Sequence, residues 1–133
     1  MNINSAVSNK EGDITFYYQK KLSQITTTKK SISQERMQGF IKEKKIKAQS
    51  LNSILDNSKF KNRKIDFLNI DVEGADLEAL QSLNFNTYKP KLICVEIIEK
   101  DLDNSKILLF LKNLKYKKIW SSGSRLSHIF LEN

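Results

Sequence analysis

The sequence predicts a mixed α/β fold in which helices connect parallel strands and an antiparallel hairpin forms one edge. The apolar runs 65–70 and 91–97 each precede a segment with apolar residues at helical spacing. The last part of the chain, residues 117–131, has two strand-like runs around a Ser-Gly-Ser turn. This order is typical of parallel strands with crossover helices and an antiparallel edge. There is no internal repeat, and we expect the 133 residues to form a single domain.

The first half of the chain has weaker patterns than the second. Residues 3–7 and 14–18 favour strands on either side of a turn sequence. Residues 19–36 are polar and lack a period, which predicts a long loop that is mobile or covers a ligand. Residues 40–47 fit either a strand or one helical turn. Residues 50–55 predict a short helix that begins after a capping serine.

The second half has clearer periods. Leucines at three-residue spacing predict a helix over 75–83, between the two apolar strands. The amphipathic segment 101–114 predicts a second helix after the second strand. We expect Tyr116 and Trp120 to cover the core beside the hairpin, and the lone His128 to lie at its surface or edge.

The formal net charge of +8 raises the question of nucleic-acid binding. Lysines gather at 42–47 and 112–118, whereas arginine is scarce. The aromatic residues lie within apolar patterns and do not alternate along the chain with basic ones, as a stacking platform requires. A basic nucleic-acid-binding domain is therefore the weaker alternative.

Composition also bears on compartment and metals. No apolar run is long enough to cross a bilayer, and the first residues lack the regions of a signal peptide. The single Cys94 cannot form an internal disulfide, so we expect a cytoplasmic protein. Ligands at zinc spacing are absent, and residues 101–112 lack the glycine and glutamate that a calcium loop requires. We expect no metal site.

Carboxylates follow the first apolar strand at the position where open α/β sheets bind ligands. Asp71 and Glu73 are two residues apart, which on an extended segment aims both side chains the same way. Alternatively, they and Asp76 only favour the N-terminus of the following helix through its dipole. Glu96 ends the next strand and either joins the same crevice or pairs with a lysine. Gly74 permits a tight turn from strand to helix.

Residues 67–76, with the sequence Phe-Leu-Asn-Ile-Asp-Val-Glu-Gly-Ala-Asp, resemble the signature strand of the FkbM family of S-adenosylmethionine-dependent methyltransferases. Other segments resemble the family in the same order, namely 4–12, 50–55, 89–96, 114–116 and 129–130. The resemblance implies a class I methyltransferase fold, a Rossmann-like, doubly wound parallel sheet that ends in an antiparallel strand. It also implies methyl transfer from S-adenosylmethionine to a hydroxyl oxygen of a sugar, lipid or small metabolite.

The resemblance assigns site residues by position. Asp71 corresponds to the residue that faces cofactor and acceptor, and Glu73 is its neighbour, so both are candidate catalytic residues. Ser5 and Ala6 correspond to the position that borders the adenine of the cofactor. Together with Asp71, they are the candidate cofactor-binding residues.

The sequence departs from the family pattern at its beginning. Members begin with a strand and a glycine-rich turn for the cofactor, then a second strand that ends in an acidic residue. Here the four glycines are far apart, and the resemblance begins at about the third strand. We therefore expect an N-terminally incomplete, truncated domain whose strand at 65–70 has an exposed edge. Such a chain binds the cofactor poorly unless a partner chain supplies the missing strands. The alternative is a non-catalytic remnant or interaction module that needs such a partner.

Overall fold

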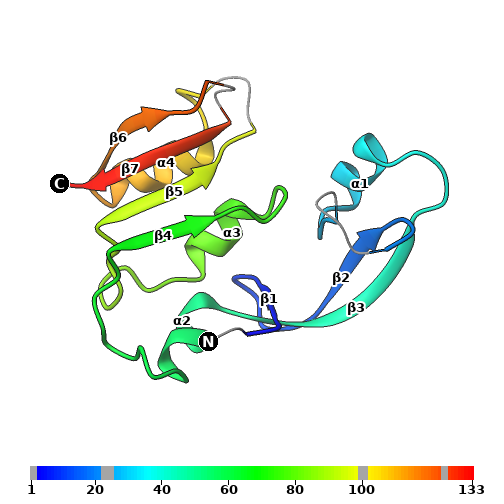
Figure 1. The fold of residues 1–133 in the computed structure, drawn as a ribbon, viewed down its shortest axis with the longest axis horizontal. Coiled ribbons are helices and arrows are strands. Elements are labelled where there is room, and N and C mark those ends of the chain that lie inside the picture. Colours follow the sequence, from blue (N-terminus) through cyan, green and yellow to red (C-terminus); the bar gives the residue numbers. More distant parts are fainter. Residues whose placement is uncertain (1–2, 22–25, 99–101, 124–125) are drawn as a thin grey trace.

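The computed structural model describes residues 3–21, 26–98, 102–123 and 126–133. Within these residues the fold is mixed α/β, with four helices and two sheets (Figure 1). The predicted class is therefore confirmed. The longest helix in the described part has only eight residues, and none could cross a membrane.

The larger sheet has the strand order β4-β5-β7-β6. It comprises β4 (Phe67–Ile70), β5 (Leu92–Glu96), β6 (Tyr116–Ser121) and β7 (Ser127–Glu132). The first two strands are parallel, and β7 runs antiparallel to both of its neighbours. The parallel pair and the closing hairpin are thus confirmed. β4 is an edge strand: on its other side it pairs with no strand in the described part of the chain.

Helices α3 (Asp76–Gln81) and α4 (Lys106–Asn113) contact each other behind this sheet in the view of Figure 1. Serine caps define the starts of two helices. The Oγ of Ser105 accepts from the Leu108 amide at the start of α4. The Oγ of Ser50 accepts from the Ser53 amide, 3.0 Å away, at the start of α2 (Leu51–Asp56). The core between helices and sheet contains fully buried apolar residues, among them Leu80, Ile93, Val95, Leu111 and Phe130.

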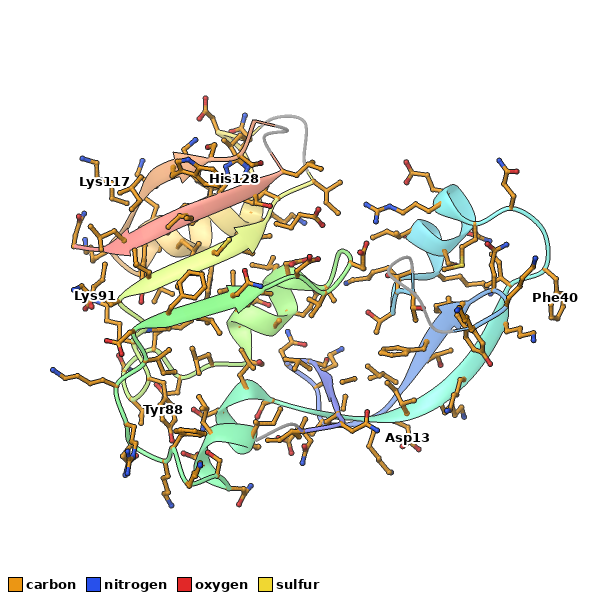
Figure 2. All side chains as sticks on the ribbon, in the orientation of Figure 1. Asp13, Phe40, Tyr88, Lys91, Lys117 and His128 are labelled. Atoms are coloured by element: carbon orange, nitrogen blue, oxygen red, sulfur yellow. The ribbon has the colours of Figure 1, made fainter. Side chains whose placement is uncertain are left out.

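The smaller sheet has the order β1-β3-β2 and extends away from the larger one (Figure 1). It comprises β1 (Ala6–Val7), β2 (Gly12–Tyr18) and β3 (Lys42–Gln49). β1 is parallel to β3, and β2 and β3 form an antiparallel ribbon. We call β2, β3 and α1 (Lys30–Arg36) the arm. Phe40 is 82% exposed and lies at the end of the arm far from the larger sheet (Figure 2).

Two predictions for the first half were wrong or too broad. The segment 19–36 was expected to be a loop, but it contains α1, whose one fully buried residue is Ser33. A helix that buries so few apolar side chains leaves no apolar period in the sequence. Residues 42–47 of the segment 40–47 belong to β3 and pair with β2, so this segment forms a strand and not a helical turn. Of residues 3–7, only the last two form a strand.

In the hairpin, the expected burial of two side chains was wrong. His128 is fully buried, since β7 lies inside the sheet between β5 and β6 (Figure 2). Its Nδ1 lies 2.9 Å from the Oγ of Ser121. Trp120 is half exposed. It pairs with Ile129, whose neighbour Phe130 points into the core beneath the helices, so Ile129 and Trp120 lie on the opposite face of the sheet. Tyr116 is buried, as predicted.

Candidate functional site

The turn after β4 reverses the chain within a few residues. Glu73 and Gly74 both have left-handed backbones, with φ of 51° and 89°. Asp76 closes the turn from within. Its Oδ1 accepts from the Val72 amide at 3.3 Å, and its Oδ2 from the Gly74 amide at 3.1 Å. By accepting from two backbone amides, Asp76 holds the turn in shape, in addition to any interaction with the dipole of the following helix.

The environment of Asp76 disfavours its charge. The residue is only 2% exposed. Burial raises the pKa of its carboxyl, the bonds from the Val72 and Gly74 amides oppose this rise, and the nearby charge of Asp71 adds to it.

The segment containing α1 packs onto this turn. The Thr27 hydroxyl donates to the carbonyl oxygen of Glu73 at 2.8 Å. Arg36 donates from Nη1 to the Glu73 carboxylate at 2.6 Å. Glycine suits the left-handed φ at this position, and a Cβ on Gly74 would overlap the Cδ1 of Ile32, so the end of that side chain would have to shift. No pattern in the sequence points to Thr27 or Arg36, since their segment has no period and their partner Glu73 is far along the chain.

A cavity of about 390 Å³ lies on one side of the turn. We call it the Asp71 cavity. Its lining includes the four predicted site residues, Ser5, Ala6, Asp71 and Glu73, together with Phe16 and Thr27. The structure thus brings together residues from β1 and from the end of β4 that are more than sixty positions apart in the sequence.

A second cavity of about 410 Å³, the Glu96 cavity, lies on the other side of the turn. Arg36, Asp76, Glu96 and Lys106 line it. Burial raises the pKa of Glu96, and the charges of Asp71, Glu73 and Asp76 raise it further, whereas Arg36 lowers it. Neither interpretation from sequence describes Glu96: it lines this second cavity and not the Asp71 cavity, and it forms no ion pair with another described residue.

The two catalytic candidates differ in their surroundings. The Glu73 carboxylate is held by Arg36, which limits its freedom to act on a substrate. Asp71 has no hydrogen bond or ion pair with another described residue, so its carboxylate is available in the cavity. No group of three or more His, Cys, Asp or Glu side chains within the described ranges could hold a metal ion.

Comparison with known proteins identifies the family. The profile described as Methyltransferase FkbM domain matches residues 1–118. Among curated proteins and solved structures, nothing matches the chain. Family members generally use S-adenosylmethionine, and the match indicates methyltransferase activity. The chain therefore belongs to the FkbM methyltransferase family.

Proposed function

We propose that this protein is an S-adenosylmethionine-dependent methyltransferase that methylates a hydroxyl group of a sugar, lipid or small metabolite. The observation that carries the proposal is the convergence of Ser5, Ala6 and Asp71 on one cavity. The resemblance assigns these residues to the cofactor from their positions in the sequence alone, where Ser5 and Ala6 are far from Asp71. A cavity of about 390 Å³ also falls within the range of small-molecule sites.

The residues of the Asp71 cavity fit part of the cofactor. Ser5 and Ala6 are small enough to leave room for an adenine ring, and Thr27 adds polar atoms to the wall. The carboxylate of Asp71 complements the positive charge of a sulfonium or the hydroxyls of a ribose. S-adenosylmethionine, when bound, supplies an activated methyl group.

Asp71 is the proposed catalytic base. Its carboxylate orients the acceptor hydroxyl and accepts the proton that the oxygen loses on methylation. Glu73 contributes through position: its ion pair with Arg36 and its carbonyl bond to Thr27 hold the turn from which Asp71 projects. The positive charge of Arg36 beside Glu73 also offsets the repulsion between the neighbouring carboxylates.

Three further features support the proposal that these strands belong to a doubly wound class I sheet. In the order β4-β5-β7-β6, the last strand along the chain, β7, is antiparallel to its neighbours. This agrees with a doubly wound sheet whose final strand in the sequence is antiparallel. Among the described residues, β1 and β4 are edge strands of separate sheets, so each has a free edge at which a further strand can pair. Finally, α3 and α4 lie on one face of the larger sheet, whereas the face with Phe67 and Trp120 keeps half-exposed apolar side chains.

The second candidate function is an interaction module completed by a partner chain. The specific observation in its favour is the exposed edge of β4, with Phe67 at 53% exposure. An apolar cavity of about 470 Å³ lies beside that edge, lined by Ile54, Leu55 and Leu68 among others. A partner that adds a strand there restores the sheet and, in the first candidate function, the cofactor site. In either case we place the protein in the cytoplasm, on the basis of its single cysteine.

Calorimetric titration of the purified chain with S-adenosylmethionine tests the proposal. We expect saturable binding that Asp71→Asn weakens at least about tenfold. Asp66→Asn is the matched control, because it makes the same change at the exposed opposite end of the strand. A folded chain that does not bind contradicts the first candidate for this chain alone and favours the interaction module. Equal affinity of wild type and Asp71→Asn contradicts the assigned site.

A further inference from the structure

One face of the ribbon formed by β2 and β3 combines aromatic and basic side chains. In the antiparallel register, Phe16 lies opposite Lys44, and Tyr18 lies opposite Lys42. Directly opposed residues point to the same face, and so do residues two apart on one strand. The four side chains therefore share one face as two successive aromatic–lysine pairs. The alternation that is absent along the sequence is present across the strands.

This face continues from the Asp71 cavity. Phe16 belongs both to the ribbon and to the lining of that cavity. Lys42 and Lys44 are exposed, and neither forms an ion pair with another described residue. On the opposite face, by contrast, Lys47 pairs with Asp13 at 2.8 Å. The two lysines beside the cavity thus remain available to a ligand.

The chemistry of this face fits a ring compound that carries negative charge. Lysine ammonium groups bind carboxylate, sulfate or phosphate groups as point charges. Aromatic side chains present a large apolar surface against which the apolar face of a sugar ring packs. We infer that Phe16, Tyr18, Lys42 and Lys44 bind an acidic glycan and direct one of its sugar hydroxyls toward Asp71. This inference rests on the proposed function and names its acceptor class.

Single-stranded nucleic acid has related chemistry but fits less well. It too combines phosphates with rings that stack on aromatic side chains. However, the face offers only two aromatic–lysine pairs, and the cavity beside it contains the carboxylates of Asp71 and Glu73. These carboxylates repel a phosphate backbone, whereas they accept hydrogen bonds from sugar hydroxyls.

Calorimetry with defined oligosaccharides tests the inference. Tetragalacturonate is the acidic probe, and maltotetraose is the neutral probe. We expect tetragalacturonate to bind at least about tenfold more tightly than maltotetraose. The double variant Lys42→Gln/Lys44→Gln should lose about tenfold in affinity for the acidic probe. Tyr18→Ala should weaken the binding of both probes, since it removes a packing surface that does not depend on charge.

The matched control is Lys45→Gln/Lys118→Gln. It removes the same charge, but Lys45 lies on the opposite ribbon face and Lys118 lies on β6. Because all four lysines are exposed, circular dichroism should be unchanged in both double variants. Equal loss of affinity in the two double variants overturns the inference, as does the absence of tetragalacturonate binding. Tighter binding of octathymidylate through Lys42 and Lys44 also overturns it and assigns the face to nucleic acid.

Titration of the same variants with S-adenosylmethionine separates the two proposals. Lys42→Gln/Lys44→Gln should bind the cofactor like the wild type, because neither lysine lines the Asp71 cavity. Oligosaccharide binding without cofactor binding supports the glycan site and contradicts the proposed function of the isolated chain. Cofactor binding without oligosaccharide binding supports the proposed function and contradicts the glycan site.

Discussion

Gly74 and Asp76 determine the shape of the turn that carries Asp71, and they do so by different means. Gly74 supplies a left-handed backbone and leaves room for Ile32. Asp76 supplies a carboxylate that accepts from two backbone amides of the turn. The sequence predicted the tight turn at Gly74, because a glycine between an apolar strand and a helix is a clear local signal. It could not predict the contact with Ile32, which belongs to a segment forty residues earlier.

The variant Gly74→Ala should lower the free energy of unfolding more than Gly39→Ala does. Both glycines have nearly the same φ, 89° and 87°, but a Cβ on Gly39 meets no atom within 4 Å. We expect about 1 kcal/mol from the backbone at each site and a further loss of about 1 kcal/mol at Gly74, because the end of the Ile32 side chain must shift. Urea denaturation measures both. The double variant Gly74→Ala/Ile32→Ala should recover part of the second loss, and equal effects of the two glycine variants would contradict the packing.

The variant Asp76→Asn should lose about 1–3 kcal/mol of stability near neutral pH, because an amide can accept from only one of the two backbone amides. Its pH dependence should also differ from that of the wild type. The folded-state pKa of Asp76 is raised, so the folded state holds the proton more tightly than the unfolded state. The wild type is therefore stabilised below the unfolded pKa and loses this contribution as pH rises through the folded value. Denaturation from about pH 4 to 7 should show a stability difference between the two proteins that is largest at low pH.

At the scale of elements, α1 is a helix that the sequence does not predict, whereas the elements with a regular apolar face are predicted. Strands and helices that bury a regular apolar face were predicted, as β5 and α4 illustrate. α1 buries little, and its place depends on distant polar contacts, notably Thr27 with the Glu73 carbonyl and Arg36 with the Glu73 carboxylate. β3 was ambiguous because six of its eight residues are exposed and its lysines mask any alternation. Contacts with distant segments therefore stabilise α1 and β3 more than the local preferences of their own residues do.

Breaking the link between α1 and the turn should loosen α1 locally. Arg36→Gln removes the ion pair with Glu73, a half-exposed contact worth about 1 kcal/mol or less to global stability. Its larger effect should be faster hydrogen exchange at the Met37 amide, which donates to the Ser33 carbonyl at the end of α1. Lys47→Gln is the control, because its pair with Asp13 lies in the open on the ribbon. Unchanged exchange in Arg36→Gln would mean that the helix does not depend on this contact.

At the scale of the whole molecule, four of the fifteen acidic residues of this basic chain lie close together. Asp71, Glu73, Asp76 and Glu96 gather where β4 and β5 end, with Arg36 among them. The signature at 67–76 and the sheet order made this position predictable, because the carboxyl ends of neighbouring parallel strands meet at one edge. The two cavities were not predictable, since elements of the arm, β2 for the Asp71 cavity and α1 for the Glu96 cavity, contribute to their walls.

The exposed edge of β4 should promote self-association. Phe67→Lys should shift sedimentation of the chain toward smaller species at high concentration, because a charge on an edge strand opposes pairing. Phe40→Lys makes the same change on the arm and should have no comparable effect. If both variants sediment like the wild type, the edge does not mediate contacts between copies.

In the proposed function, the segment around β1 and the end of β4 together form one cofactor site. Titration of ¹⁵N-labelled chain with S-adenosylmethionine, followed by amide chemical shifts, tests this shared site. We predict saturable shifts at residues 5–7 and 71–75, and none along the hairpin at 127–132. Shifts confined to other parts of a folded chain, or shifts at only one of the two predicted segments, would contradict a shared site.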